Sequence, residues 1–167
     1  MLVGAAGSGK TTVRRRLVAA GLPAGRVVSL DDERLALSAV DAAAGREPLV
    51  LQAYSLPAVR RAERAAADLL AQGCGYLADA THLRRRERVP HVRAARAAGL
   101  PAVAVLLPAL DVDVLLARTA DRPPQRRIPL DVLARHAHRR SLLDAQRLLH
   151  EDGFDAVVDV GAVLAGG

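Results

Sequence analysis

The residues best suited to chemistry form one short loop near the amino terminus. Residues 4–11 match the pattern G-x-x-x-x-G-K-[ST] at every fixed position. Small residues let backbone N–H groups curl around phosphate oxygens, and a helix beginning at Lys10 would point its positive end at them. Lys10 would reach the outer phosphates of ATP, and the Thr11 hydroxyl would bind Mg²⁺. The predicted ATP–Mg²⁺ site comprises Gly4, Gly7, Ser8, Gly9, Lys10, Thr11 and Thr12.

The alternative is a chance match in a chain that contains 13 glycines. Two features argue against chance. The apolar pair Leu2-Val3 precedes the loop and a helix-compatible stretch follows it, which is the context such a loop needs. Lys10 is also the only lysine among 24 basic residues. An ammonium group in an otherwise Arg-only chain indicates a chemical need at that position.

Carboxylates follow two of the predicted strands. Asp31 and Asp32 come directly after residues 27–30, at the edge of the sheet where α/β proteins bind ligands. Asp31 is a candidate general base for an attacking hydroxyl, or it merely caps the next helix. Asp79 ends the strand at 75–79 and is a candidate Mg²⁺ carboxylate that acts through water. The pattern predicts a base and a metal carboxylate at one edge.

Two basic side chains near these carboxylates, Arg34 and His82, each have two possible roles. Arg34 shares a helical face with Asp31, so it could hold an acceptor phosphate or simply pair with that carboxylate. His82 could touch substrate, but we expect a polar surface side chain. The other histidines show no ligand spacing with Cys or acidic residues, so we expect no metal other than nucleotide-borne Mg²⁺. These are His91, His136, His138 and His150.

Four arginines lie within or just before the proline-rich segment 121–129, which we expect to be a mobile loop. They are Arg118, Arg122, Arg126 and Arg127. Arg118 and Arg122 can face the same way if the helix before the loop continues. Arginines on a closing loop neutralise charge on a transferring phosphoryl group. The alternative is a solvated turn in an Arg-rich chain.

The elements that must position these residues alternate between short apolar runs and longer amphipathic stretches, as in β-α-β units. We expect strands at 2–3, 27–30, 75–79, 102–107 and 156–160. We expect helices at 10–20, 31–43, 48–72 (with a possible interruption near Pro57), 84–98, 111–119 and 130–150. The prediction is an α/β fold in one domain over residues 1–167, with a lid at about 118–130. The first strand is short enough that the native start could lie upstream of Met1.

Composition narrows the class of protein. Half of the residues are hydrophobic and only 2% are aromatic, which excludes a disordered chain and predicts a core of Leu, Val and Ala. The net charge of +6 fits an anionic partner such as a nucleotide or nucleic acid. A compositional bias toward Arg over every solvated helix face explains the same charge, so charge alone identifies no partner.

The single cysteine, Cys74, excludes an internal disulfide and fits a reducing compartment. It lies in an apolar run, where we expect a buried small residue rather than a nucleophile. We also expect no signal peptide, because Met1 leads straight into the loop, and no apolar run approaches the ~20 residues of a membrane span. The expectation is a cytoplasmic protein without a membrane partner.

Together these residues resemble the kinase module of bacterial and phage end-healing polynucleotide 5′-kinases, within the wider group of small P-loop kinases often labelled AAA-family ATPases. The resemblance covers nearly the whole chain in order, through residues 4–12, 29–34, 79–81 and 118–123. It implies a three-layer P-loop NTPase fold with one parallel five-stranded sheet of order 2-3-1-4-5. Asp31 would be the base, Arg34 would hold the acceptor's phosphate, and Arg118 and Arg122 would belong to the lid.

The implied reaction moves the γ-phosphate of ATP to a hydroxyl, and we expect the 5′-OH of a polynucleotide, with ATP and Mg²⁺ as cofactors. Two features depart from the family. His82 stands where the pattern usually has Asn, and no phosphatase or ligase domain accompanies the module. A small-molecule kinase for a metabolite, nucleoside or antibiotic, or a non-catalytic ATP-binding module, therefore remains an alternative. The implied catalytic residues are Lys10, Asp31, Arg34, Arg118 and Arg122.

Overall fold

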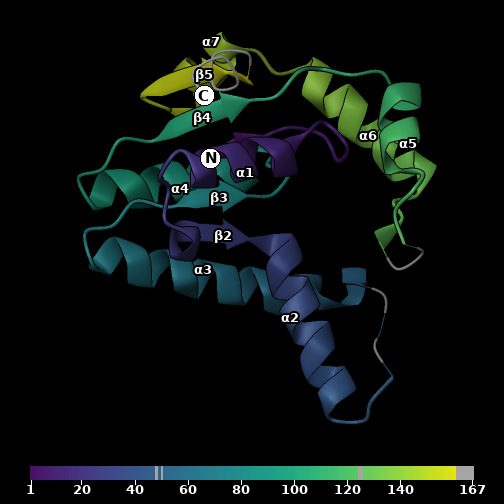
Figure 1. Cartoon of the computed structure of the whole chain (residues 1–167). Coiled ribbons are helices and arrows are strands. Elements are labelled where there is room, and N and C mark those ends of the chain that lie inside the picture. Colours follow the sequence, from purple (N-terminus) through teal and green to yellow (C-terminus); the bar gives the residue numbers. More distant parts are fainter. Residues whose placement is uncertain (48, 50, 124–125, 161–167) are drawn as a thin grey trace.

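A computed structural model describes residues 1–47, 49, 51–123 and 126–160 of the chain. The predicted α/β class is confirmed: parallel strands lie between helices that cover both faces (Figure 1). The described strands are β1 (Leu2–Val3), β2 (Val27–Ser29), β3 (Leu77–Asp79), β4 (Val103–Leu106) and β5 (Ala156–Asp159). Each lies within two residues of its predicted position.

The predicted single five-stranded sheet is wrong. In the described part of the chain β4 lies between β1 and β5 in one sheet, while β2 pairs only with β3 in another. The two sheets adjoin where the Gly4 N–H donates to the Thr81 carbonyl at 3.0 Å, just beyond β1 and β3. The neighbours along the stack still agree with the order 2-3-1-4-5. Strand β1 has only two residues, and among the described strands it pairs with β4 alone.

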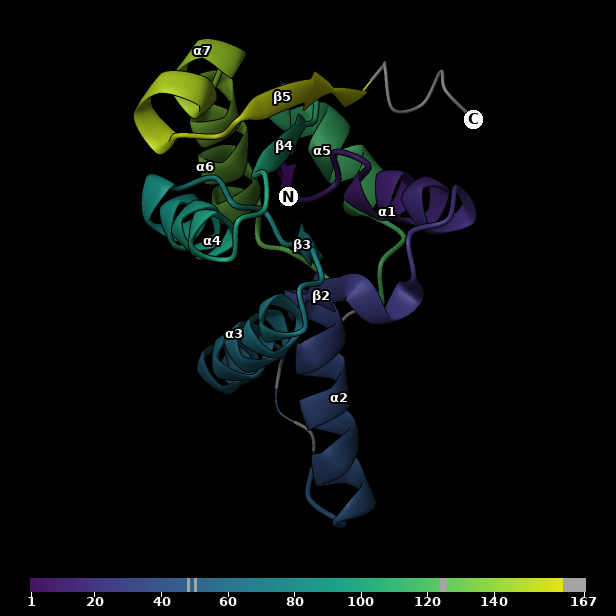
Figure 2. The ribbon, with the colours of Figure 1, turned by 90° about the vertical axis from the view of Figure 1, so that its left-hand side faces the viewer.

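Helix α1 (Lys10–Ala19) covers one face of the strands, and α3 (Ser55–Ala71) and α4 (Arg85–Ala97) cover the other face (Figure 2). The α-helices are α1 (Lys10–Ala19), α2 (Leu30–Ala43), α3 (Ser55–Ala71), α4 (Arg85–Ala97), α5 (Val112–Thr119), α6 (Leu130–Ser141) and α7 (Ala145–Arg147). The short 3-10 turns η1 (Ala24–Arg26) and η2 (Leu51–Tyr54) precede β2 and α3, and the π-helical turn η4 (Leu148–Asp152) follows α7.

Two predicted helices differ from the observed ones. The helix predicted over 130–150 is broken after Ser141, because the Asp144 carboxylate accepts from the Arg147 N–H at 2.8 Å and starts α7 anew. The helix predicted over 48–72 begins at Ser55, after η2, and Pro48 lies outside the described residues. Pro57 causes no interruption, since it lies in the first turn, where a helix needs no N–H donor.

The core is centred on β1. Successive side chains of a strand point to opposite faces, and both residues of β1 have no exposed surface. Leu2 packs with Val13 of α1 and Val105, whereas Val3 packs with Val92 of α4 and Phe154 on the other face. Two residues therefore hold the start of the phosphate loop between both layers of helices. No helix in the described ranges is long and apolar enough to cross a membrane.

Candidate active site

The phosphate loop joins β1 to α1 and needs glycine at three positions. A Cβ on Gly4 would lie 2.7 Å from the Ser8 Oγ and 2.8 Å from the Leu107 Cβ, so no side chain fits there. Gly7 and Gly9 have φ of 83° and 103°, a region that residues with a Cβ rarely adopt. Gly9 immediately precedes the first turn of α1. The loop's course is thus set by packing at one glycine and by backbone conformation at two.

Lys10 lies at the mouth of this loop. Its half-buried Nζ donates to the carbonyls of Gly4 (3.1 Å) and Ala5 (2.7 Å). Burial lowers the pKa of Lys10 to about 8, and the nearby carboxylates of Asp79 and Asp31 oppose that shift. The ammonium group is therefore held by the loop itself and lies in the field of carboxylates from two other segments.

The loop also presents polar groups that suit a phosphate–metal ligand. The Ser8 Oγ is buried and has no hydrogen-bond partner among the described residues. The side chains of Thr11 and Thr12 are exposed in the first turn of α1, where backbone N–H groups point outward. Hydroxyl and carboxylate oxygens are the ligands Mg²⁺ prefers. The residues present therefore fit a nucleoside triphosphate with Mg²⁺.

Arg14 joins two acidic segments and was missed by sequence reasoning. Its Nη1 lies 2.7 Å from the Asp32 Oδ2 and 3.1 Å from the Asp79 Oδ2. The Asp79 side chain is 10% exposed; burial raises its pKa, while Arg14 and Lys10 lower it. The available signal was the spacing of four residues from Lys10, which places Arg14 on the same face of α1.

Asp31 and Arg34 form an ion pair at the start of α2. The Arg34 Nη1 donates to the Asp31 Oδ1 at 2.7 Å, and its Nε donates to the Ser55 Oγ at 3.3 Å. The alternative that Asp31 caps α2 is wrong, because Ser29 is the N-cap and its Oγ accepts from the Asp32 N–H. The Asp31 side chain is 82% exposed, so its second oxygen is accessible to a ligand.

Helix α5, at the base of the predicted lid, packs directly on the phosphate loop. A Cβ on Gly7 would lie 3.1 Å from the Thr119 Cγ2 and 3.2 Å from the Leu115 carbonyl, both in α5. Arg122, just beyond α5, is close enough to Lys10 to lower that lysine's pKa. The helix ends at Thr119, so the continuous helix that would align Arg118 with Arg122 is absent. Arg118 is exposed in the last turn of α5.

The rest of the predicted lid is partly described. Arg126 and Arg127 are exposed, and the Arg127 Nε donates to the Arg122 carbonyl at 3.4 Å. Residues 124 and 125 lie outside the described ranges. The structure therefore brings one arginine of the lid, Arg122, toward the phosphate loop.

Two histidines differ from expectation. The predicted surface position of His82 is wrong: its side chain is buried, and its Nδ1 lies 2.9 Å from the Leu2 carbonyl. Burial lowers the pKa of His82 to about 3. His136 of α6, which sequence reasoning set aside, has its pKa lowered to about 4 by burial and then by Lys10. Its buried Nδ1 has no partner in the described part of the chain. No spacing signal in the sequence indicated either environment.

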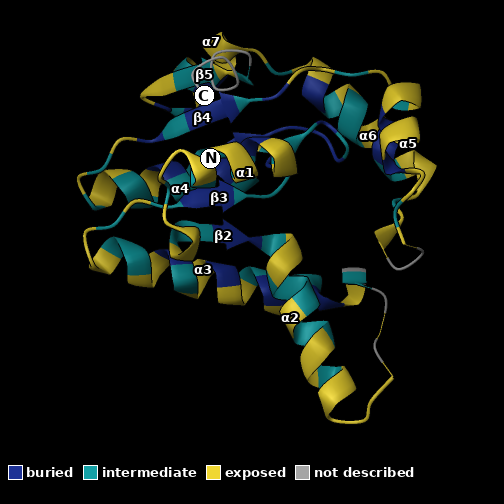
Figure 3. Ribbon diagram, viewed as in Figure 1, coloured by how far each residue is buried: buried dark blue, intermediate teal, exposed yellow. Residues whose placement is uncertain are grey.

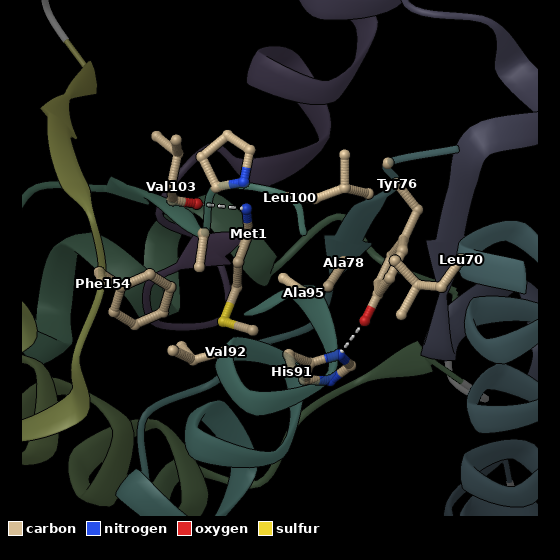
Figure 4. Close-up of a pocket in the computed structure, with 13 residues that line it drawn as sticks. Met1, Leu70, Tyr76, Ala78, His91, Val92, Ala95, Leu100, Val103 and Phe154 are labelled. Carbon is tan, nitrogen blue, oxygen red and sulfur yellow. Dashed lines mark hydrogen bonds between the residues drawn. The ribbon is translucent and has the colours of Figure 1, made fainter. Parts of the chain in front are cut away.

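A small cavity of about 80 Å³ lies at the opposite edge of the strands (Figure 4). Its walls come from the amino ends of β1, β3 and β4 and from α3 and α4, and two lining residues, Tyr76 and His91, are hydrogen-bonded at 2.6 Å between the hydroxyl and Nδ1. Cys74, just after the end of α3, is half-buried rather than buried as predicted. The Arg26 Nη2 donates to its Sγ at 3.2 Å. The cavity is not part of the candidate site.

Comparison with known proteins agrees with this geometry. The family model described as an AAA domain matches residues 1–143, which include the phosphate loop, both acidic segments and the segment predicted to be a lid. Proteins of this family have a nucleotide-binding P-loop domain with kinase- or ATPase-like activity. A search among curated proteins finds no match. Since the family model covers most of the chain and the loop has the geometry it requires, the chain belongs to the AAA domain family.

Proposed function

We propose that this chain is an ATP-dependent kinase that transfers the γ-phosphate to a hydroxyl, namely the 5′-OH of a polynucleotide. One arrangement carries the proposal: Arg14 bridges Asp32 and Asp79 at 2.7 and 3.1 Å, so the start of α2 with Asp31 and the end of β3 with Asp79 meet beside the helix that begins at Lys10. Helix α5, which precedes Arg122, packs on Gly7 of the same loop. Phosphoryl transfer needs a phosphate-binding cation, a base, a metal carboxylate and a lid cation around one point. In this proposal one of each is supplied, respectively, by Lys10, Asp31, Asp79 and Arg122.

The donor half of the proposed mechanism uses residues 4–12. Their backbone N–H groups cradle the phosphates, and Lys10 binds the β- and γ-oxygens. The Thr11 hydroxyl and, through water, Asp79 would hold Mg²⁺, which neutralises charge on those oxygens. Arg14 keeps the Asp79 carboxylate directed toward α1 through its 3.1 Å contact.

The acceptor half uses Asp31 and Arg34. The acceptor oxygen attacks the γ-phosphorus, the bond to the β–γ bridging oxygen breaks, and ADP leaves. Asp31 takes the proton of the attacking hydroxyl. Arg34 orients Asp31 through their ion pair and binds a phosphate of the acceptor. Arg122 neutralises charge on the phosphoryl group during its transfer. Arg118, exposed in the last turn of α5, is the second cation proposed for the lid.

A polynucleotide acceptor is supported by the open surroundings of the base. The Asp31 side chain is 82% exposed. An open hollow of about 330 Å³ adjoins the start of α2, and its lining includes Arg14, Arg15 and Asp32. Arginines along an open surface suit a phosphodiester backbone, whereas a metabolite is usually enclosed.

The experiment is transfer of label from γ-labelled ATP in parallel reactions with 5′-OH DNA, 5′-OH RNA and a panel of small hydroxyl acceptors. Oligonucleotides that already carry a 5′-phosphate are the matched control. Label on the 5′-OH strands alone supports the proposal. Label on a metabolite instead indicates a small-molecule kinase, and ATP binding without transfer indicates a non-catalytic binding module. Lys10→Ala should abolish transfer in the reaction that works while the protein stays folded.

A further inference from the structure

The corner that follows β3 has an unusual backbone. His82 has a φ of 46°, in the left-handed region that residues with a Cβ seldom adopt. A buried residue stays in such a conformation only where its surroundings hold it there. The corner lies three residues beyond Asp79, so whatever holds His82 also limits the movement of that carboxylate.

Three hydrogen bonds hold the corner. The His82 Nδ1 bonds the Leu2 carbonyl (2.9 Å), and the Gly4 N–H donates to the Thr81 carbonyl (3.0 Å). Both tie the corner to the start of the phosphate loop. The third comes from the opposite side, where the Arg88 Nη1 donates to the His82 carbonyl at 2.9 Å.

Arg88 is itself held by a buried ion pair. Its Nε lies 2.5 Å from the Asp152 Oδ2, and the two side chains are 3% and 1% exposed. Arg85 approaches the other oxygen of Asp152 at 3.4 Å but is 62% exposed. Asp152 belongs to η4 and lies beyond the 143 residues that the family model matches. The turn η4 thus reaches back to the corner beside the phosphate loop.

We propose that the Arg88–Asp152 pair is a positioning pair for the site, which fixes the Thr81-His82 corner and with it Asp79 relative to Gly4. This inference rests on the proposed function, in which Asp79 holds Mg²⁺. An apolar pair of similar size would pack as well as a buried ion pair. Only the guanidinium fork donates in two directions at once, to a carboxylate and to the His82 carbonyl.

The test compares nucleotide affinity with and without Mg²⁺. The double variant Arg88→Met/Asp152→Leu removes both buried charges and the bond to His82, yet leaves no unpaired charge in the core. A fluorescent ATP analogue is titrated into wild type and variant, once with Mg²⁺ and once with EDTA, and thermal melting is recorded. We expect the variant to fold and the gain in affinity from Mg²⁺ to shrink by roughly ten- to hundred-fold, as when partners behind a metal ligand are removed. Affinity in EDTA should change little.

Controls separate positioning from stability. Arg85→Met removes the exposed partner of the same carboxylate and should leave the Mg²⁺ gain unchanged. Asp79→Asn is the reference for complete loss of the gain. If the double variant keeps the wild-type gain, or loses affinity equally with and without Mg²⁺, the positioning role is wrong. If Asp79→Asn itself keeps the gain, the metal role in the proposed function fails and this inference with it.

The variant Arg88→Lys keeps the buried positive charge and tests the proposal even if the double variant does not fold. Arg88→Lys keeps the ion pair with Asp152 but cannot also reach the His82 carbonyl in the same geometry. We expect it to melt near wild type and to lose a large part of the Mg²⁺ gain. A full wild-type gain in Arg88→Lys would overturn the proposal even if the double variant does not fold.

Discussion

Two regions meet at the carboxyl ends of the strands and are held in different ways. We call residues 4–12 with Asp79 the proposed donor side, and Asp31, Arg34 and the predicted lid the proposed acceptor side. On the donor side Gly4 is closed in by neighbours, and the Asp79 side chain is 10% exposed. On the acceptor side the Asp31 side chain is 82% exposed, and α2 has no buried residue, since its residues are either exposed or half-buried (Figure 3).

This difference in burial indicates how substitutions on each side should affect stability and catalysis. Backbone hydrogen bonds and glycines with positive φ restrict the conformation of the proposed donor loop, so we expect the loop to bind one kind of ligand. An exposed ion pair such as Asp31–Arg34 contributes only about 0–1 kcal/mol to stability, so the acceptor side can change without unfolding the protein. Changes on the acceptor side should therefore alter catalysis alone, whereas changes on the donor side should alter stability as well.

The largest expected effect is a loss of turnover caused by a substitution in the predicted lid. Arg122→Ala should lower turnover by about 10³–10⁵, the range seen where an arginine stabilises a transferring phosphoryl group. Melting temperature should stay at the wild-type value, because the side chain packs into no core cluster of the described residues. Steady-state kinetics and thermal melting check this. The matched control is Arg126→Ala in the same loop, and an equal loss in both variants would contradict a specific role for Arg122.

The next effect concerns the base. Asp31→Asn should lower kcat by about 10²–10⁴, the usual contribution of a general base, and leave ATP affinity within about twofold. Single-turnover transfer and ATP titration check the two halves separately. Asp32→Asn is the neighbouring control, because Asp32 pairs with Arg14 rather than Arg34. A larger loss in Asp32→Asn would move the base to that residue.

A glycine pair tests the rigidity of the donor side. Gly7 and Gly21 both have positive φ, but a Cβ would meet Thr119 and Leu115 only at Gly7. Each change to Ala should destabilise the fold by about 1–2 kcal/mol through backbone strain. Gly7→Ala should also weaken ATP binding by roughly tenfold, since about 1.4 kcal/mol of loop distortion corresponds to that factor. Denaturant melts and nucleotide titration distinguish them, and unchanged ATP binding in Gly7→Ala would refute a rigid loop.

The smallest effect is a dependence of stability on pH. Burial lowers the folded-state pKa values of His82 to about 3 and of His91 to about 4, from 6.5. Between pH 6.5 and about 4 the unfolded chain therefore binds more protons, so stability present above pH 6.5 is lost as pH falls. We expect the melting temperature to drop by more than about 4 °C from pH 7 to pH 5, given about 2–4 °C per kcal/mol.

Substitution of a histidine assigns this dependence. His91→Gln should reduce the drop, while His138→Gln, at an exposed position of α6, should leave it unchanged. Thermal melts at half-unit pH intervals provide the comparison. An undiminished drop in His91→Gln would mean that other groups account for it.

The sequence by itself determined the donor loop and the alternation of strands and helices. Local pattern is sufficient there, because a phosphate loop is defined by residue types at fixed spacing and a strand or helix by its hydrophobic period. The spacing of Asp31 and Arg34 likewise predicted their shared face, and the structure pairs them at 2.7 Å. The break after Ser141 was missed because the Asp144 cap competes with a helix that the hydrophobic pattern continues.

Tertiary structure alone decided how the segments meet. Arg14 looked like one more arginine of a helix until Asp32 and Asp79 were brought to the same guanidinium. His82 looked exposed because nothing nearby in sequence indicates that Leu2, 80 residues away, bonds it. Asp152 reaches Arg88 over 64 residues. Such contacts depend on how separate elements pack, and no local periodicity encodes them.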